Sequence, residues 1–111
     1  MPLDHRLAVY GTLAPGRSNH HQLAGLTGSW QPGHVRGHFQ PTGWGAAQGY
    51  PALTLDAAAD PVPVLLFTSA DLPEHWPRLD AFEGADYRRV IVSIDTEAGP
   101  ITAWLYEAAP R

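Results

Sequence analysis

The stretch Arg88–Tyr106, RRVIVSIDTEAGPITAWLY, predicts two long strands joined by a tight turn. Apolar residues occupy every second position of the strands Arg88–Asp95 and Pro100–Tyr106: Val90, Val92 and Ile94, then Ile101, Ala103 and Leu105. Alternation with a period of two is typical of half-buried strands. Residues 96–99, TEAG, favour a hairpin turn between them. The carboxyl-terminal part of the chain therefore builds sheet.

The segment before this hairpin favours a helix over Leu72–Phe82. Trp76, Leu79 and Phe82 recur at helical spacing, Asp71 is a plausible N-cap, and Gly84 is a stop signal. Pro77 lies inside the pattern and is expected to split it into a turn and a shorter helix.

Shorter elements are predicted in the rest of the chain. Strands are expected at 7–10, 35–39, 52–55 and 62–67, and a short helix at 19–24 with Ser18 as its cap. Residues 40–49, QPTGWGAAQG, have the composition of a loop. The expected fold is a single α+β domain over residues 1–111, with a curled or closed sheet and one or two helices.

Composition excludes several classes of function. Of the 111 residues 44% are apolar, which is enough for a core, and 11 acidic against 7 basic residues give a net charge of −4. The basic residues are scattered, so no nucleic-acid partner is expected. The absence of cysteine and lysine excludes disulfides, thiolate metal sites and lysine Schiff bases. No signal peptide or membrane span is recognisable, so the predicted location is the cytoplasm, with no membrane partner.

The first predicted strand runs directly into a glycine-rich turn. Val9-Tyr10-Gly11-Thr12-Leu13 is followed by Ala14-Pro15-Gly16. Glycines allow successive backbone N–H groups to converge on an anion. The alternative is an ordinary strand end, which this segment alone does not exclude.

Glu83 lies at the last turn of the predicted helix, in LDAFEG (79–84). The negative pole of the helix dipole disfavours a carboxylate there by a few tenths to about 1 kcal/mol. That dipole and the apolar neighbours should both raise the pKa of Glu83, toward the range of a useful general base. The alternative is a solvated glutamate at a frayed helix end.

The six histidines do not predict a metal site. His34 and His38 lie four residues apart, and on a strand this separates them by about 13 Å, which is too far for one ion. No metal or other cofactor is expected.

Several of these segments together resemble the γ-glutamylcyclotransferase-like (AIG2-like) family. The segment 9–13, VYGTL, resembles the Tyr-Gly-Ser/Thr-Leu signature of that family, and residues 50–53, YPAL, are similar to its mid-chain Tyr-Pro-Ala/Gly-Leu segment. LDAFEG (79–84) with YRR (87–89) resembles its Leu-Asp-x-Tyr/Phe-Glu-Gly…Tyr-x-Arg block, and AWLY (103–106) its closing strand. The matches occur in the family's order over nearly the whole chain.

The resemblance implies a small closed or partly open mixed β-barrel, flanked by one to three short helices, and a reaction. The α-amine of a γ-glutamyl group attacks its own γ-carbonyl, which releases an amine or amino acid and 5-oxoproline. Glu83 matches the family's general acid/base, and the loop matching Tyr10, Gly11, Thr12 and Leu13 holds the glutamyl group. The chain departs from the family at residues 64–67, VLLF, where many relatives carry Gly-Glu-Leu-Tyr, so the substrate stays open.

Three further residues are candidates for substrate binding. Tyr50 could line the pocket, although a Tyr-Pro turn packed on the barrel explains it nearly as well. Tyr87 and Arg89 could shape or charge its rim. The alternative for this pair is that Tyr87 covers the core and Arg89 pairs with a surface acid.

Three functions from different classes remain open at this point. The first is an enzyme acting on a small-molecule γ-glutamyl substrate, as a monomer or weak homodimer. The second is a non-catalytic module that binds such a metabolite, and the third is a barrel used for protein contacts.

Overall fold

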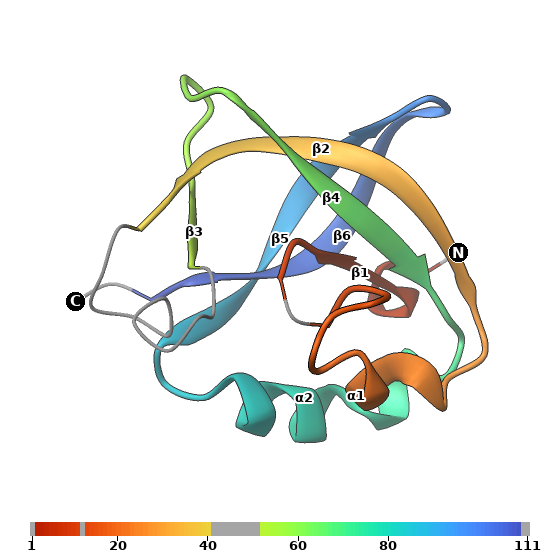
Figure 1. Ribbon diagram of the computed structural model, residues 1–111. Helices are drawn as coiled ribbons and strands as arrows, with labels where there is room; N and C mark the ends of the chain where they lie inside the picture. The colour runs from red at the N-terminus through yellow and green to blue at the C-terminus, as the bar shows by residue number, and fades with distance from the viewer. Residues whose placement is uncertain (1, 12, 41–51, 110–111) are drawn as a thin grey trace.

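The computed structural model describes residues 2–11, 13–40 and 52–109. Its strands are β1 (Arg6–Val9), β2 (Ser29–Phe39), β3 (Leu53–Leu55), β4 (Pro61–Thr68), β5 (Tyr87–Thr96) and β6 (Gly99–Ala108). The α-helices are α1 (His21–Ala24) and α2 (Trp76–Glu83), and the 3₁₀ turns are η1 (Leu3–His5) and η3 (Leu72–Glu74). Figure 1 shows both α-helices on one side of a curved sheet.

The sheet closes on itself. Its strand order is β3-β2-β4-β1-β6-β5, and β2 also pairs with β5 where His34 lies opposite Asp95. All strands except β3 therefore form a closed barrel, and β3 extends the sheet beside β2. The barrel is mixed, because β1 and β6 are parallel and the other neighbours are antiparallel. The predicted α+β barrel is confirmed.

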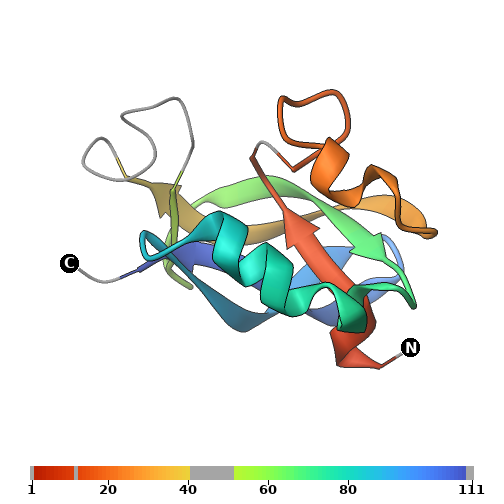
Figure 2. The same ribbon diagram turned by 90° about the horizontal axis from the view of Figure 1, so that it is seen from below.

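Alternation along the strands divides the core into two layers. In β1, Ala8 points into the barrel and packs with Leu66 and Leu105, whereas Leu7 and Val9 point outward. The outward residues pack beneath the helices with Leu23, Phe67, Leu72, Trp76 and Leu79. Figure 2 shows α2 lying against the barrel on the side where β1 runs. The helices are thus held by the outer face of the strands.

The predicted helix is divided, as the sequence suggests, but the division precedes Pro77. The 3₁₀ turn η3 ends at Glu74, and α2 begins at Trp76 with Pro77 in its first turn, where a proline needs no hydrogen-bond partner for its nitrogen. Asp71 does occupy an N-cap position, that of η3, but its side chain makes no capping hydrogen bond, and its carboxylate accepts one from the Thr27 backbone N–H instead.

Two other sequence predictions need correction. Ser18 does not cap α1, since the residue at the N-cap position is His20. The strand predicted at 35–39 is only the end of β2, which starts at Ser29. Gly37 lies within β2, and a Cβ there would lie 2.5 Å from the Thr54 carbonyl oxygen, so glycine permits the close approach of β3. Among the described residues, the structure has no helix that could span a membrane.

Candidate active site

Glu83 is the last residue of α2 and lies beside the end of the barrel where β1 ends. The helix is fixed by Trp76 and Leu79, which are both buried in the layer beneath the helices. It stops because Gly84 has a φ of 76°, a conformation that favours glycine. Two anchored turns therefore hold Glu83 in place.

Burial perturbs the carboxyl group of Glu83. Its side chain is half-buried, and the loss of hydration raises its pKa from 4.5 to about 7. Among the described residues, none donates a hydrogen bond to this carboxylate or forms an ion pair with it. A carboxyl group that titrates near neutrality can accept and return a proton, which is the property of a general acid/base.

Tyr10 lies close to Glu83 at the same end of the barrel. Burial raises the pKa of the Tyr10 phenol, and the negative charge of Glu83 is among the smaller contributions in the same direction. Burial likewise raises the pKa of Tyr106, Asp80 raises it further, and the charge of Glu83 makes the smallest contribution. Glu83 therefore lies within electrostatic range of both phenols.

The Tyr10 hydroxyl joins three strands. It donates a hydrogen bond to the Tyr106 carbonyl oxygen at 2.5 Å and accepts one from the Leu53 backbone N–H at 3.2 Å. The ring packs near Phe39, with centroids 5.8 Å apart. These contacts fix the point where the chain leaves β1 and enters the loop that follows it.

The edge of β3 that faces away from β2 forms hydrogen bonds with side chains and not with a further strand. β2 pairs with one edge, and on the other the N–H groups of Leu53 and Leu55 donate to the Tyr10 hydroxyl and the Glu107 carboxylate. Glu107 is buried, and its other carboxylate oxygen accepts two hydrogen bonds from Arg88 at 2.8 and 3.0 Å. Sequence reasoning missed Glu107, because its partners are distant in the chain.

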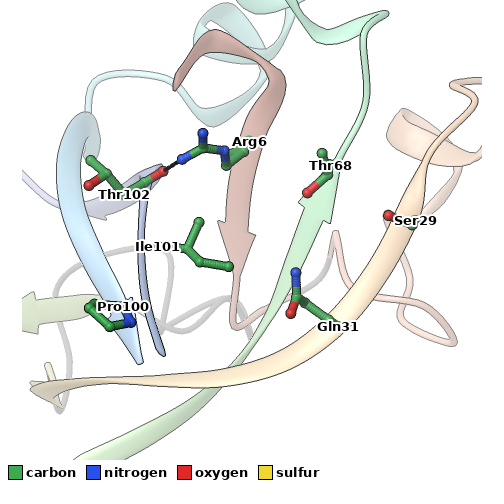
Figure 3. Close-up of a pocket in the computed structure, with 7 residues that line it drawn as sticks. All are labelled: Arg6, Ser29, Gln31, Thr68, Pro100, Ile101 and Thr102. Atoms are coloured by element: carbon green, nitrogen blue, oxygen red, sulfur yellow. Dashed lines mark hydrogen bonds between the residues drawn. The ribbon is translucent and has the colours of Figure 1, made fainter. Parts of the chain in front are cut away.

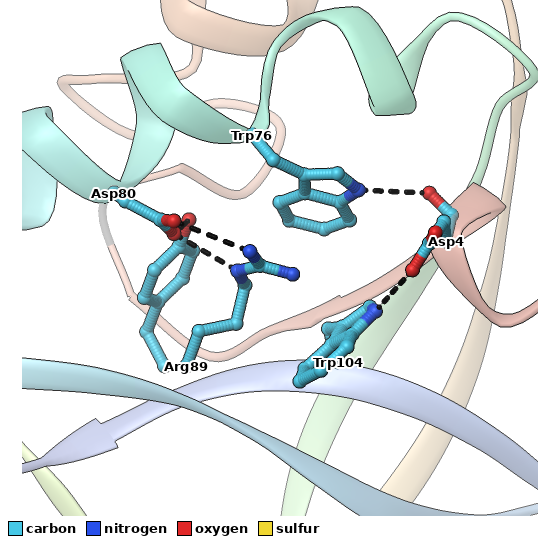
Figure 4. A network of polar contacts seen from close by, with 6 residues as sticks. Asp4, Trp76, Asp80, Arg89 and Trp104 are labelled. Atoms are coloured by element: carbon cyan, nitrogen blue, oxygen red, sulfur yellow. Dashed lines mark hydrogen bonds and ion pairs between the residues drawn. The ribbon is translucent and has the colours of Figure 1, made fainter.

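A polar network ties α2 to the barrel one turn before Glu83 (Figure 4). Asp80 accepts hydrogen bonds from Arg89 at 2.9 and 3.2 Å and from the Tyr106 hydroxyl at 2.7 Å. Partial burial alone would raise the pKa of Asp80, but the hydrogen bonds from Arg89 and Tyr106 outweigh it and hold this pKa below its ordinary value.

The Arg89 guanidinium is stacked between two indole rings. Its central carbon lies 4.3 Å from the ring centroid of Trp76 and 4.4 Å from that of Trp104. Both indoles donate hydrogen bonds to Asp4, Trp76 to its carbonyl oxygen and Trp104 to its carboxylate. Arg89 is thus a clamp between β5 and α2, which positions Glu83 indirectly.

The predicted site residues fall into three groups. Tyr10 and Glu83 lie at one end of the barrel, where Gly11 is half-buried and Leu13 is packed into the core beneath the helices. Thr12 and Tyr50 lie outside the described residues.

Tyr87 and Arg89 follow the structural alternatives that the sequence offered. Tyr87 packs against the helix-side core, and Arg89 pairs with Asp80. A direct contact of either with a substrate stays a prediction. In the part of the chain that the structure describes, no three His, Asp or Glu side chains are grouped as metal ligands.

The sequence was also compared with known families. The family described as gamma-glutamyl cyclotransferase, AIG2-like, matches residues 7–111. The chain belongs to this family. The match includes α2 and all of the barrel strands except Arg6, the first residue of β1, so the AIG2-like family assignment rests on the same elements that position Tyr10 and Glu83. Curated proteins gave no sequence match.

Solved structures share the AIG2-like fold. An AIG2-like protein from Mus musculus has a TM-score of 0.73 at 19% identity, and the match covers 95% of this chain and 77% of that one. YkqA from Bacillus subtilis has a TM-score of 0.72 at 24% identity. The match covers 94% of this chain but only 35% of YkqA. The protein PH0828 from Pyrococcus horikoshii has a TM-score of 0.61 at 24% identity, and the match covers 96% of this chain and 80% of PH0828. At these identities the likeness establishes the fold alone.

Proposed function

We propose that this protein cyclises a small γ-glutamyl amine or γ-glutamyl amino acid to 5-oxoproline, with Glu83 as the general acid/base. The observation that carries the proposal is the half-buried Glu83 carboxyl group, whose pKa is raised to about 7 beside Tyr10. Membership of the AIG2-like γ-glutamyl cyclotransferase family supports the reaction type. The protein would act in the cytoplasm as a monomer or weak homodimer.

The reaction is an intramolecular acyl transfer that conserves all atoms of the substrate. Glu83 removes a proton from the α-ammonium group, and the amine nitrogen then attacks the γ-carbonyl carbon. The tetrahedral intermediate collapses with cleavage of the original amide bond as Glu83 returns the first proton to the leaving nitrogen. The ring nitrogen loses its second proton to solvent, and the released amine takes up a proton from solvent. The products are 5-oxoproline and a free amine or amino acid.

The elevated pKa of Glu83 makes the first proton transfer less unfavourable. An ordinary glutamate, with a pKa of 4.5, is a weak base toward an ammonium group. A pKa near 7 reduces the difference between the pKa of Glu83 and that of the ammonium group, and it still leaves a large fraction of the carboxyl groups ionised at neutral pH. Because nucleophile and carbonyl belong to one molecule, holding the chain folded can supply several kcal/mol, about 7–11 in the best intramolecular cases.

The developing oxyanion needs hydrogen-bond donors. Arg88 and Arg89 both follow α2 in the sequence, but Arg88 binds Glu107 and Arg89 binds Asp80. We therefore assign this role to backbone N–H groups of the loop 10–13, where the family resemblance places the glutamyl group. Such fixed donors act without reorganisation during the reaction.

The proposal is tested by measuring 5-oxoproline release from a panel of γ-glutamyl amines and γ-glutamyl amino acids. Turnover of at least one compound by the wild-type protein is the expected result. Binding of these compounds without turnover would instead support the non-catalytic metabolite-binding module. Failure of every compound to bind would leave a barrel used for protein contacts.

A further inference from the structure

A hollow lies at the opposite end of β1 from Tyr10. It has a volume of about 580 Å³ and lies between the first residues of β2 and β6, with Arg6 of β1 and Thr68 of β4 between them (Figure 3). Arg6 and Tyr10 are four residues apart, which corresponds to about 13 Å along a strand. The hollow is therefore separate from the candidate active site, and its volume falls in the range of small-molecule sites, roughly 300–1,000 Å³.

Strand register makes one wall of this hollow polar, whereas Pro100 and Ile101 of β6 contribute apolar surface on the other side. Arg6 lies opposite Thr68, and Thr68 lies opposite Ser29, so these residues form one row across β1, β4 and β2. The next row contains Ala8 and Leu66, which belong to the barrel core, and Gln31 lies opposite Leu66 on β2. The polar lining thus borders directly on the apolar core of the barrel.

The chemistry of the lining favours a negatively charged ligand. Arg6 contributes a permanent positive charge, and its Nη1 donates to the Thr102 carbonyl oxygen at 2.6 Å, which orients the guanidinium. Ser29, Thr68 and Gln31 add hydroxyl and amide groups. None of the described lining residues is acidic, although acidic residues outnumber basic ones 11 to 7 in the whole chain.

We propose that this hollow is a second binding site, for a small molecule that carries an oxyanion beside hydroxyl groups. Arg6 binds the oxyanion, because guanidinium groups form strong charge-assisted hydrogen bonds with carboxylate and phosphate oxygens. Ser29, Thr68 and Gln31 bind the neighbouring hydroxyl groups. The site is independent of the proposed cyclisation, so its ligand need not be a γ-glutamyl compound.

The test is a titration of the full-length ¹⁵N-labelled protein with glycerol phosphate at constant ionic strength, followed by amide chemical shifts. Saturable shifts are expected at residues 6, 29–31, 68 and 101–102. Inorganic phosphate should shift the same amides with weaker affinity, and neutral glycerol should not saturate them. Glu83→Gln should retain this binding, since Glu83 lies at the other end of the barrel.

Variants distinguish binding at a specific site from a general attraction of the anionic ligand to the positive charges of the protein. Arg6→Gln is expected to weaken glycerol phosphate binding about tenfold or more. The matched control is Arg36→Gln, because Arg36 also donates to a backbone carbonyl, that of Ala59, but lies outside the hollow. Since Arg6→Gln also removes the bond to Thr102, Thr68→Val provides a second variant, with an expected weakening of about threefold.

Three results would overturn the proposal. The first is the absence of saturable shifts with glycerol phosphate, and the second is glycerol binding as tightly as glycerol phosphate. The third is equal loss of affinity in Arg6→Gln and Arg36→Gln, which would show that only overall charge matters.

Discussion

Glu83→Gln is expected to lower kcat/KM for 5-oxoproline release by about 10²–10⁴, the usual contribution of a general acid/base. Glutamine has nearly the same shape as glutamate and can occupy the same half-buried position, but it cannot accept the proton of the α-ammonium group. The loss should appear in kcat, because the carboxylate acts on the proton during the reaction. Initial rates of wild type and variant, measured with the best substrate of the panel, check this prediction.

The same substitution should stabilise the folded protein above neutral pH. Since the pKa of Glu83 is raised to about 7 from 4.5, the folded state favours the protonated carboxyl group. This contribution to stability is complete below pH 4.5 and is lost as the pH rises through 7. At pH 8, Glu83→Gln should therefore unfold with a free energy about 1–3 kcal/mol greater than wild type, and at pH 4 the two should be similar.

Chemical denaturation at the two pH values distinguishes a lost base from a damaged fold. Glu97→Gln, in the exposed turn between β5 and β6, is the matched control and should change neither activity nor stability. An inactive Glu83→Gln that is less stable than wild type at both pH values would contradict the assignment, because misfolding would then explain the loss.

Arg89→Met is expected to lower the free energy of unfolding by about 2–4 kcal/mol. The substitution removes two charge-assisted hydrogen bonds to Asp80 and the stacking of a cation between Trp76 and Trp104. The side chain of Arg89 is only 21% exposed, so water screens these interactions less than at an ordinary surface pair. Chemical denaturation at constant pH measures the effect.

Two further variants identify the origin of that loss. Arg89→Lys keeps the charge but loses the two-pronged contact and the planar stacking, and should recover only part of the stability. Arg78→Met, on the exposed side of α2, should cost less than about 1 kcal/mol. If Arg89→Met costs no more than Arg78→Met, the clamp does not hold α2 in place.

Local patterns in the sequence predict most of the fold. The alternation in residues 88–106 identifies β5 and β6, and the spacing of Trp76, Leu79 and Phe82 identifies α2. The first part of β2 was missed because Pro32 and Gly33 lie within it. A Cβ at Gly33 would lie 2.7 Å from an Ile94 methyl group, so glycine there serves a close approach that no local pattern reveals.

Closure of the barrel and the network around Asp80 depend on contacts between distant segments. Among the described residues, β2 and β5 share one register pair, His34 with Asp95, and a single pair leaves no sequence pattern. Asp80 stands three residues before Glu83 in the LDAFEG motif, yet its partners Arg89 and Tyr106 come from other elements. The position of Glu83 at the helix end could be predicted, whereas its burial, the cause of the raised pKa, required the structure.

The proposed role of Glu83 as general acid/base requires its carboxyl group to titrate near neutrality in the folded protein. It is tested most directly by ¹³C NMR titration of protein labelled at the glutamate side chains, with the Glu83 resonance assigned by its absence from Glu83→Gln. Because burial raises the pKa of Glu83, we expect this resonance to titrate with a pKa of about 7. A titration midpoint near 4.5 would contradict it, because Glu83 would then be an ordinary solvated carboxylate.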